Sequence, residues 1–182
     1  MPDRAALIAH LLAHSVRTGD FTLKSGKKSP YFIDSKQTAC RPDGILLVAE
    51  AVLGLVPDDA TAIGGLTMGA DPIAYATATY AAMRGRELKV FSVRKEVKDH
   101  GGGGRIAGAL DAGDKVVLTE DTTSRGTSIL EAALAVRAAG ADPILMLALV
   151  DRGGTAAAVA ADAGIPFAAV VTGPDLGFAY DN

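Results

Sequence analysis

Apolar residues along the chain follow two patterns, one with helical spacing and one of short continuous runs. Helical spacing predicts helices over residues 3–17, 42–56, 70–84, 128–139 and 154–163. Short apolar runs predict strands at residues 61–65, 88–93, 115–120, 143–150 and 166–171. Residues 21–34 alternate in part around a Ser-Gly turn, which predicts a strand, a turn and a second strand.

This order of elements determines the expected fold class. Strands that alternate with helices form βαβ units, so we expect an α/β protein with a mostly parallel central sheet flanked by helices. The strands are apolar on both sides, as strands covered on both faces should be. No repeat or linker interrupts the pattern, so residues 1–182 are expected to form a single domain. In such sheets, ligands bind at the carboxyl ends of the strands.

Composition excludes several classes of protein. Hydrophobic residues make up 49% of the chain, and a net charge of −3 argues against nucleic-acid binding driven by bulk charge. No apolar run reaches the roughly 18 residues that a membrane span needs, and the first residues lack the pattern of a signal peptide. Cys40 is the only cysteine, so no intramolecular disulfide can form. We therefore expect a cytoplasmic protein that binds neither nucleic acid nor membrane.

The segment EDTTSRGTS joins a predicted strand to a predicted helix. A loop of small residues before a helix can direct several N–H groups at a phosphate. Glu120 and Asp121 would repel that phosphate, but they suit a neighbouring group rich in donors, such as vicinal sugar hydroxyls, or a cation. A phosphorylated sugar would satisfy both halves of the segment. The residue types alone leave open the alternative of a helix cap beside two solvated acids.

Residues 94–108 combine cations with four consecutive glycines and show no usable periodicity. Because glycines cost conformational entropy when they are ordered, we expect a mobile loop without a stable element here. The cations that precede the glycines are Arg94, Lys95, Lys98 and His100. Such a loop could close over a polyanion and neutralise charge on a leaving group, and a solvated surface loop is the alternative.

Further candidates lie in turns and at strand ends. Thr67 and Met68 lie in a glycine-rich turn after a strand, where the backbone could approach an anion. Arg152 ends a strand and could pair with a carboxylate, either of a ligand or of its own chain. Lys24 lies in a turn. Phe32, beyond that turn, could pack against a flat ligand ring, although the spacing favours a core aromatic.

Together these segments resemble the orotate phosphoribosyltransferase family, which has the type I phosphoribosyltransferase fold. The resemblance is carried by FTLKSGKKSPYFID, GGLTMGADP, FSVRKEVKDHGGGGRIAG, VVLTEDTTSRGTS and LVDRGG, in the family's order over residues 21–154. It implies a small hood built from the N-terminal segment, roughly residues 1–40. It also implies transfer of the 5-phosphoribosyl group from phosphoribosyl pyrophosphate to orotate, giving orotidine 5′-monophosphate and pyrophosphate in de novo pyrimidine biosynthesis.

The resemblance implies a role for each segment. Asp121 and Lys98 would be catalytic, and Mg²⁺ would be held mainly by the pyrophosphate and ribose hydroxyls, with Glu120 and Asp121 reaching it through water. The residues expected to bind phosphoribosyl pyrophosphate are Thr67, Met68, Arg94, Lys95, Lys98, His100, Glu120, Asp121, Thr122, Thr123, Ser124, Arg125, Gly126, Thr127 and Ser128. Those expected to bind orotate are Lys24, Phe32, Ile33, Ser124 and Arg152. In the family the cationic loop reaches the neighbouring subunit, which implies a homodimer that shares residues 94–108.

The chain departs from the family pattern at Met68. Many relatives have a Lys there that contacts pyrophosphate, so either the backbone or a cation elsewhere must serve in this chain. One alternative is a phosphoribosyltransferase for another base, such as a purine, against which Lys24 and Arg152 argue. A second is a regulator that senses phosphoribosyl pyrophosphate without catalysis, and Lys98 and His100 argue against it.

Overall fold

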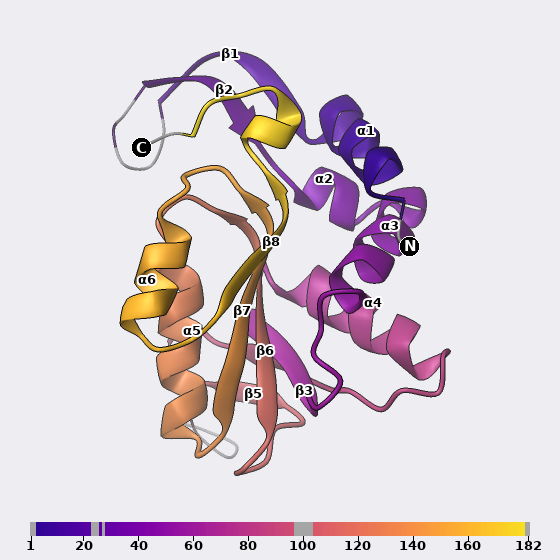
Figure 1. Cartoon of the computed structure of the whole chain (residues 1–182), viewed down its shortest axis with the longest axis vertical. Helices are drawn as coiled ribbons and strands as arrows, with labels where there is room; N and C mark the ends of the chain where they lie inside the picture. Colours follow the sequence, from indigo (N-terminus) through magenta and orange to yellow (C-terminus); the bar gives the residue numbers. More distant parts are fainter. Residues whose placement is uncertain (1–2, 23–25, 27, 97–103, 181–182) are drawn as a thin grey trace.

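The computed structural model describes residues 3–22, 26, 28–96 and 104–180 (Figure 1). The helices are α1 (Arg4–His14), α2 (Lys36–Ala39), α3 (Pro42–Leu53), α4 (Asp71–Ala82), α5 (Thr127–Ala138), α6 (Ala156–Asp162) and the short 3-10 helix η1 (Pro174–Leu176). The strands are β1 (Val16–Thr22), β2 (Lys28–Ile33), β3 (Ala62–Leu66), β4 (Lys89–Val93), β5 (Ile106–Gly108), β6 (Lys115–Thr123), β7 (Asp142–Asp151) and β8 (Phe167–Thr172). None of the helices in these ranges is long and apolar enough to cross a lipid bilayer.

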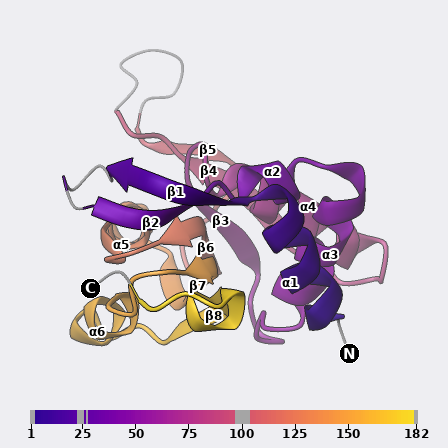
Figure 2. The ribbon, with the colours of Figure 1, turned by 90° about the horizontal axis from the view of Figure 1, so that it is seen from above.

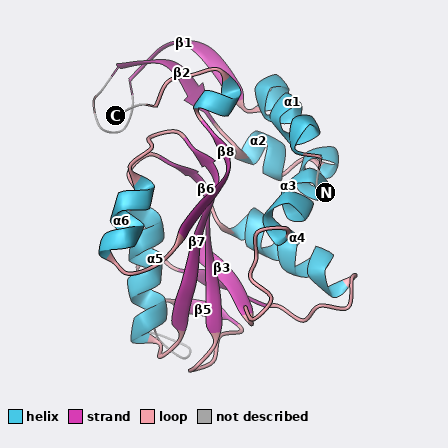
Figure 3. Ribbon diagram, in the orientation of Figure 1, coloured by secondary structure: helices cyan, strands magenta, loops and turns pink. Residues whose placement is uncertain are grey.

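Six strands form one twisted sheet in the order β5-β4-β3-β6-β7-β8. Neighbouring strands are parallel except for β4 and β5, which confirms the predicted class of a mostly parallel α/β sheet. Figure 3 shows α5 and α6 on one face of this sheet and α3 and α4 on the other. The strand order reverses between β3 and β6, so the carboxyl ends of these two strands form a topological switch point, where such sheets bind ligands.

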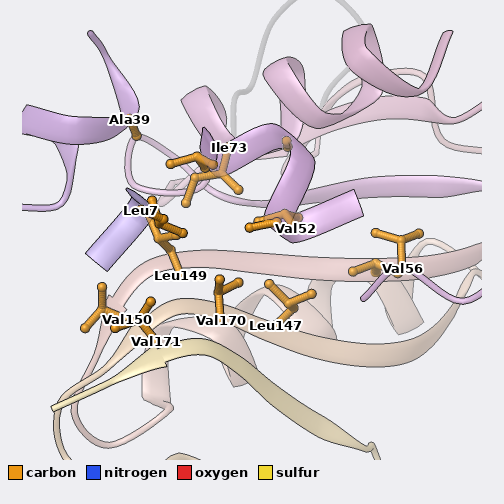
Figure 4. Close-up of a cluster of buried hydrophobic side chains, with 14 of the residues drawn as sticks. Leu7, Ala39, Val52, Val56, Ile73, Leu147, Leu149, Val150, Val170 and Val171 are labelled. Carbon is orange, nitrogen blue, oxygen red and sulfur yellow. The ribbon is translucent and has the colours of Figure 1, made fainter. Parts of the chain in front are cut away.

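Each face of the sheet carries its own apolar core. On one face, Leu147 and Leu149 of β7 pack with residues of α1, α3 and α4, among them Val52 (Figure 4). On the other face, Met146 of β7 packs with Ile129 of α5. Successive residues of one strand thus enter opposite cores, which is why the strands are apolar on both sides.

Helices α1 and α2 and strands β1 and β2 form a hood above the carboxyl ends of the central strands (Figure 2). In the hood, β1 and β2 pair as an antiparallel ribbon. The segment after β8 reaches the same region, because Arg4 forms an ion pair with Asp175 at 2.5 Å and the ring of Tyr31 stacks on Phe178 with centroids 4.1 Å apart. The hood is therefore tied to the last described residues of the chain.

Three expectations from the sequence need correction. Residues 16 and 17, expected at the end of the first helix, belong to β1 instead, because β1 pairs with β2 from Val16 onward. The strand expected at residues 115–120 continues to Thr123, because β6 pairs with β7 as far as Thr123 and Asp151. The expectation that residues 94–108 hold no stable element is wrong for residues 106–108, which form β5. That strand is too short to show a period in the sequence, and its pairing with the edge of β4 decides its conformation.

Candidate active site

At the switch point, the turn after β3 touches two adjacent carboxylates of β6. A Cβ at Gly69 would stand 2.7 Å from Oε1 of Glu120 and 2.6 Å from Oδ1 of Asp121, so only glycine fits without displacing these groups. The turn begins with Thr67 and Met68, which are joined by a cis peptide bond. The structure thus brings the predicted anion-binding turn and the predicted acidic pair into direct contact.

Glu120 and Asp121 are both buried, with 7% and 8% of their surface exposed, so the alternative of solvated acids beside a helix cap is wrong. Burial raises the pKa of Glu120 to about 8, and a hydrogen bond with Asp121 acts in the same direction. Burial also disfavours the charge of Asp121, but hydrogen bonds from Glu120 and Lys36 lower its pKa. At neutral pH, Glu120 therefore keeps its proton while Asp121 is ionised.

Lys36, the first residue of α2, supplies that hydrogen bond to Oδ2 of Asp121. Its Nζ also lies 3.8 Å from Oδ1 of Asp34. The hydroxyls of Ser35 and Thr122 are hydrogen-bonded at 2.7 Å, which holds the start of α2 against the end of β6. Sequence reasoning missed Lys36 because it lies 85 residues before its partner, and the only available signal was its place directly after the segment FTLKSGKKSPYFID.

The loop after β6 leads into α5. Gly126, with φ +75°, is the N-cap of α5 and offers no side-chain oxygen to the N–H groups of the first turn. These N–H groups and the partial positive charge of the helix end suit an anion. Thr123 is buried and its hydroxyl accepts a hydrogen bond from Gly126 N at 2.9 Å, so this side chain stabilises the loop. Arg125, Thr127 and Ser128 are exposed.

The loop after β7 packs against the loop after β6. Arg152 N donates to the carbonyl oxygen of Thr123 at 2.9 Å. Gly153 approaches Ser124 so closely that a Cβ would stand 1.8 Å from the Ser124 carbonyl oxygen. Asp151 closes the second loop by accepting a hydrogen bond from Gly153 N at 3.1 Å. The predicted phosphate-binding and orotate-binding segments therefore form one surface.

The side chain of Arg152 is buried between the end of β7 and the hood. Its guanidinium carbon lies 4.8 Å from the centre of the Tyr31 ring, and Nη2 donates to Ser29 Oγ at 3.3 Å. A stacked guanidinium keeps its plane fixed, which suits the bidentate binding of a carboxylate.

The spacing in the sequence favoured a core position for Phe32, and this prediction is wrong. Phe32 is 40% exposed, and its ring lies 5.8 Å from that of Phe21. Tyr31 and Ile33 are buried instead, because side chains alternate along β2 and those two point toward the body of the protein. The structure therefore places the side chain of Phe32 on the opposite face of β2 from Tyr31 and its partner Arg152.

Of the predicted cationic loop, Arg94 and Lys95 are described, whereas Lys98 and His100 lie outside the described residues, as does Lys24 of the hood turn. Thr67 N donates to the carbonyl oxygen of Val93 at 2.8 Å, so Arg94 follows directly beside the turn after β3. Arg94 N also donates to the carbonyl oxygen of Arg105 at 2.7 Å, which closes the base of the loop.

The donor set limits how a metal could be held. Within residues 3–22, 26, 28–96 and 104–180, no group of three or more His, Cys, Asp or Glu side chains is arranged as a metal site. Glu120 and Asp121 do offer carboxylate oxygens, the ligand type that Mg²⁺ prefers. Because Glu120 keeps its proton and Asp121 pairs with Lys36, this pair suits an ion that a phosphorylated ligand holds for the most part.

Comparisons with known proteins agree on one family. No protein-family model matches the chain. The chain is 40% identical over 181 residues to the orotate phosphoribosyltransferase of Streptomyces avermitilis, which covers 98% of this chain and 94% of the relative. The structure of Mycobacterium tuberculosis H37Rv orotate phosphoribosyltransferase in complex with Fe(III) dicitrate has a TM-score of 0.87 and 34% identity, over 97% of this chain and 100% of that one. A structure of the Mycobacterium tuberculosis protein in complex with phosphoribosyl pyrophosphate has a TM-score of 0.81 and 31% identity, over the same shares of the two chains.

Proposed function

Because the chain belongs to the orotate phosphoribosyltransferase family, we propose that it transfers the 5-phosphoribosyl group of phosphoribosyl pyrophosphate to orotate. The products are orotidine 5′-monophosphate and pyrophosphate, a step of de novo pyrimidine biosynthesis. The observation that carries the proposal is the buried pair Glu120–Asp121 at the switch point, next to the uncapped start of α5.

The two halves of this site suit the two halves of a ribose 5-phosphate group. The 5′-phosphate would accept hydrogen bonds from the N–H groups at the start of α5 and from the hydroxyls of Thr127 and Ser128. The ribose hydroxyls would lie over the acidic pair, where ionised Asp121 accepts hydrogen bonds and protonated Glu120 can donate one. As the bond from the ribose to pyrophosphate breaks, positive charge develops on the ribose, and the carboxylate of Asp121 stabilises it.

The leaving pyrophosphate would lie against the turn that begins at Thr67 and Met68. Arg94 and Lys95 stand beside this turn, and Lys98 and His100 would close over the pyrophosphate from the same loop. Mg²⁺, when bound, would neutralise part of the charge of the leaving group. The pyrophosphate and the ribose hydroxyls would hold the ion, with Glu120 and Asp121 in contact through water.

Orotate would lie near the loop after β7. Arg152 would bind the orotate carboxylate, and Ser124 on the adjoining loop would donate to the ring. Lys24, Phe32 and Ile33 remain predicted orotate contacts from the hood, and Phe32 would contribute through its backbone, because its side chain lies on the opposite face of β2 from Arg152. Buried Ile33 can contribute through its backbone, because its side chain belongs to the core.

We also propose a homodimer in which residues 94–108 serve the neighbouring site. An apolar groove between α3 and α4 supports this, with exposed Leu46, Tyr75 and Met83 along it. Because α4 follows directly from the turn after β3, a second copy in this groove would stand beside the pyrophosphate subsite. The exposed free thiol of Cys40 agrees with a reducing cytoplasm as the place of the reaction.

The test is turnover. The purified protein is mixed with orotate, phosphoribosyl pyrophosphate and Mg²⁺, and the loss of orotate absorbance is followed. Parallel reactions contain adenine, guanine, hypoxanthine or uracil instead of orotate, and their nucleotide products are detected directly. Turnover with orotate alone is expected. Turnover with another base would change the substrate assignment. Binding of phosphoribosyl pyrophosphate without any turnover would favour the sensing regulator.

A further inference from the structure

Lys36 lies at the boundary between the acidic pair and the turn after β3. Its ammonium donates to Oδ2 of Asp121, while Oδ1 of the same carboxylate lies against Gly69. The ammonium and the turn therefore contact the two oxygens of the same carboxylate. A ligand that touched both the ribose side of Asp121 and the turn would pass directly beside Lys36.

The ion pair is asymmetric in its exposure. The side chain of Lys36 is 41% exposed, whereas that of Asp121 is 11% exposed. The hydrogen bond between Ser35 and Thr122 joins the start of α2 to β6, and the ammonium is carried on a flexible four-carbon stem that can turn while α2 stays in place. Partial burial disfavours its charge, but the hydrogen bond to Asp121 raises the pKa of Lys36, which stays protonated at neutral pH.

The turn itself has a backbone that suits an anion but no cationic side chain. Thr67 is uncharged, and Met68 has 69% of its surface exposed. A polyanion bound here needs a positive charge from another element, because backbone dipoles alone compensate little of its charge. Arg94 and Lys95 stand beside the turn, and Lys36 is a further cation there, because it shares the contact with Asp121.

We propose that Lys36 is a substrate-binding residue that exchanges partners, from Asp121 in the free protein to the pyrophosphate of phosphoribosyl pyrophosphate in the complex. This inference rests on the proposed function, since it takes the substrate from it. The exchange frees Oδ2 of Asp121 for the ribose hydroxyls at the moment when the polyanion needs a cation. Lys36 thus serves both subsites with one movement of its side chain.

Direct binding tests the exchange without any turnover. Inorganic pyrophosphate with Mg²⁺, and separately ribose 5-phosphate, are titrated by calorimetry into the wild type, Lys36→Gln, Lys36→Arg and Lys115→Gln. Lys115 is the matched control, because it pairs with exposed Asp59 at 2.7 Å at the other end of β6. In Lys36→Gln, pyrophosphate should bind about tenfold or more weakly, and ribose 5-phosphate within about twofold of wild type or tighter. Lys36→Arg should keep most of the affinity for pyrophosphate, and Lys115→Gln should match the wild type.

A structural role of Lys36 gives a different result. If Lys36 only held Asp121 in place, Lys36→Gln would weaken both ligands alike, and this outcome would overturn the proposal. Unchanged pyrophosphate binding in Lys36→Gln, or no pyrophosphate binding by the wild type, would also overturn it. A wild type that binds both ligands but turns over no orotate would refute the proposed function alone.

Discussion

The guanidinium carbon of Arg152 lies 4.8 Å from the centre of the Tyr31 ring, although Arg152 follows β7 and Tyr31 belongs to the hood. Tyr31 also contacts the segment after β8. Tyr31 donates through its hydroxyl to the carbonyl oxygen of Ala179 at 3.2 Å, and its ring stacks on Phe178. The orientation of Arg152 therefore depends on the hood, on the central sheet and on the segment after β8.

Replacing Arg152 by Ala should raise the KM for orotate by about tenfold to a hundredfold and change the KM for phosphoribosyl pyrophosphate little. The reason is that a charge-assisted pair with the orotate carboxylate would be lost, while the phosphate loop would keep its own contacts. Steady-state kinetics with each substrate varied in turn measures both constants. Tyr31→Phe is the control, because it keeps the ring over Arg152 and removes the hydroxyl that donates to Ala179. Equal effects of Arg152→Ala on both substrates would mean that Arg152 is structural.

Gly69→Ala should reduce kcat/KM for phosphoribosyl pyrophosphate by about a hundredfold, because the new Cβ would displace both buried carboxylates from their positions. Leu134→Ala is the control. Leu134 is exposed on α5, outside the proposed site, so kinetics should stay near wild type. Thermal unfolding of both variants distinguishes loss of the site from loss of the fold. A Gly69→Ala protein with full activity would contradict the close contact between the turn and the acidic pair.

Stability should depend on pH through Glu120. Its pKa is about 8 in the folded protein against an ordinary value of 4.5, so the folded state binds an additional proton between these values. The stability from this carboxyl is fully present below about 4.5 and is lost as the pH rises through about 8. The free energy of unfolding without ligand should therefore fall from pH 6 to pH 9, by at most about 1.4 kcal/mol for each unit of pKa difference. Asp121, whose pKa is lowered, stays ionised over that range and adds no slope.

Urea unfolding at pH 6 and pH 9 measures this effect, and Glu120→Gln should lose most of it, because an amide does not titrate. The same decline in Glu120→Gln as in the wild type would assign the pH dependence to another group.

Lys98→Ala should lower kcat by about a hundredfold or more and weaken substrate binding much less, because its proposed role is to stabilise the leaving pyrophosphate. Lys28→Ala, which changes an exposed lysine of β2, provides the comparison. Single-turnover kinetics would separate the chemical step from product release. An unchanged kcat in Lys98→Ala would remove this residue from the mechanism.

The groove between α3 and α4 should form the interface of the proposed homodimer. Leu46→Glu or Met83→Glu would add charge to an apolar surface, so each variant should sediment as a monomer. Each should also lose activity, because the site would no longer receive residues 94–108 from a second copy. Leu134→Glu is the control, because Leu134 is also exposed but lies on α5, across the sheet. Analytical ultracentrifugation measures all three variants. A dimer that persists in Met83→Glu and dissociates in Leu134→Glu would place the interface on the other face.

Local patterns in the sequence were sufficient for the order of elements. Continuous apolar strands require helices on both faces, so the parallel sheet could be predicted from residues such as Val116 and Leu147 without any knowledge of their partners. The acidic pair and the hydroxyl-rich loop were also visible, because residues that are adjacent in the chain carry them. The family could be recognised for the same reason, since its motifs are short and continuous.

Contacts between distant parts of the chain required the tertiary structure. Pairing with a neighbouring strand extended β6 through Asp121 and gave residues 106–108 their conformation, and neither effect has a local signal. Alternation along β2 decided that Tyr31, not Phe32, meets Arg152. Lys36 reached Asp121 only because α2 docks on the end of β6. A sequence determines which residues are neighbours along the chain, whereas the pKa of Glu120 and the partner of Lys36 depend on neighbours in space.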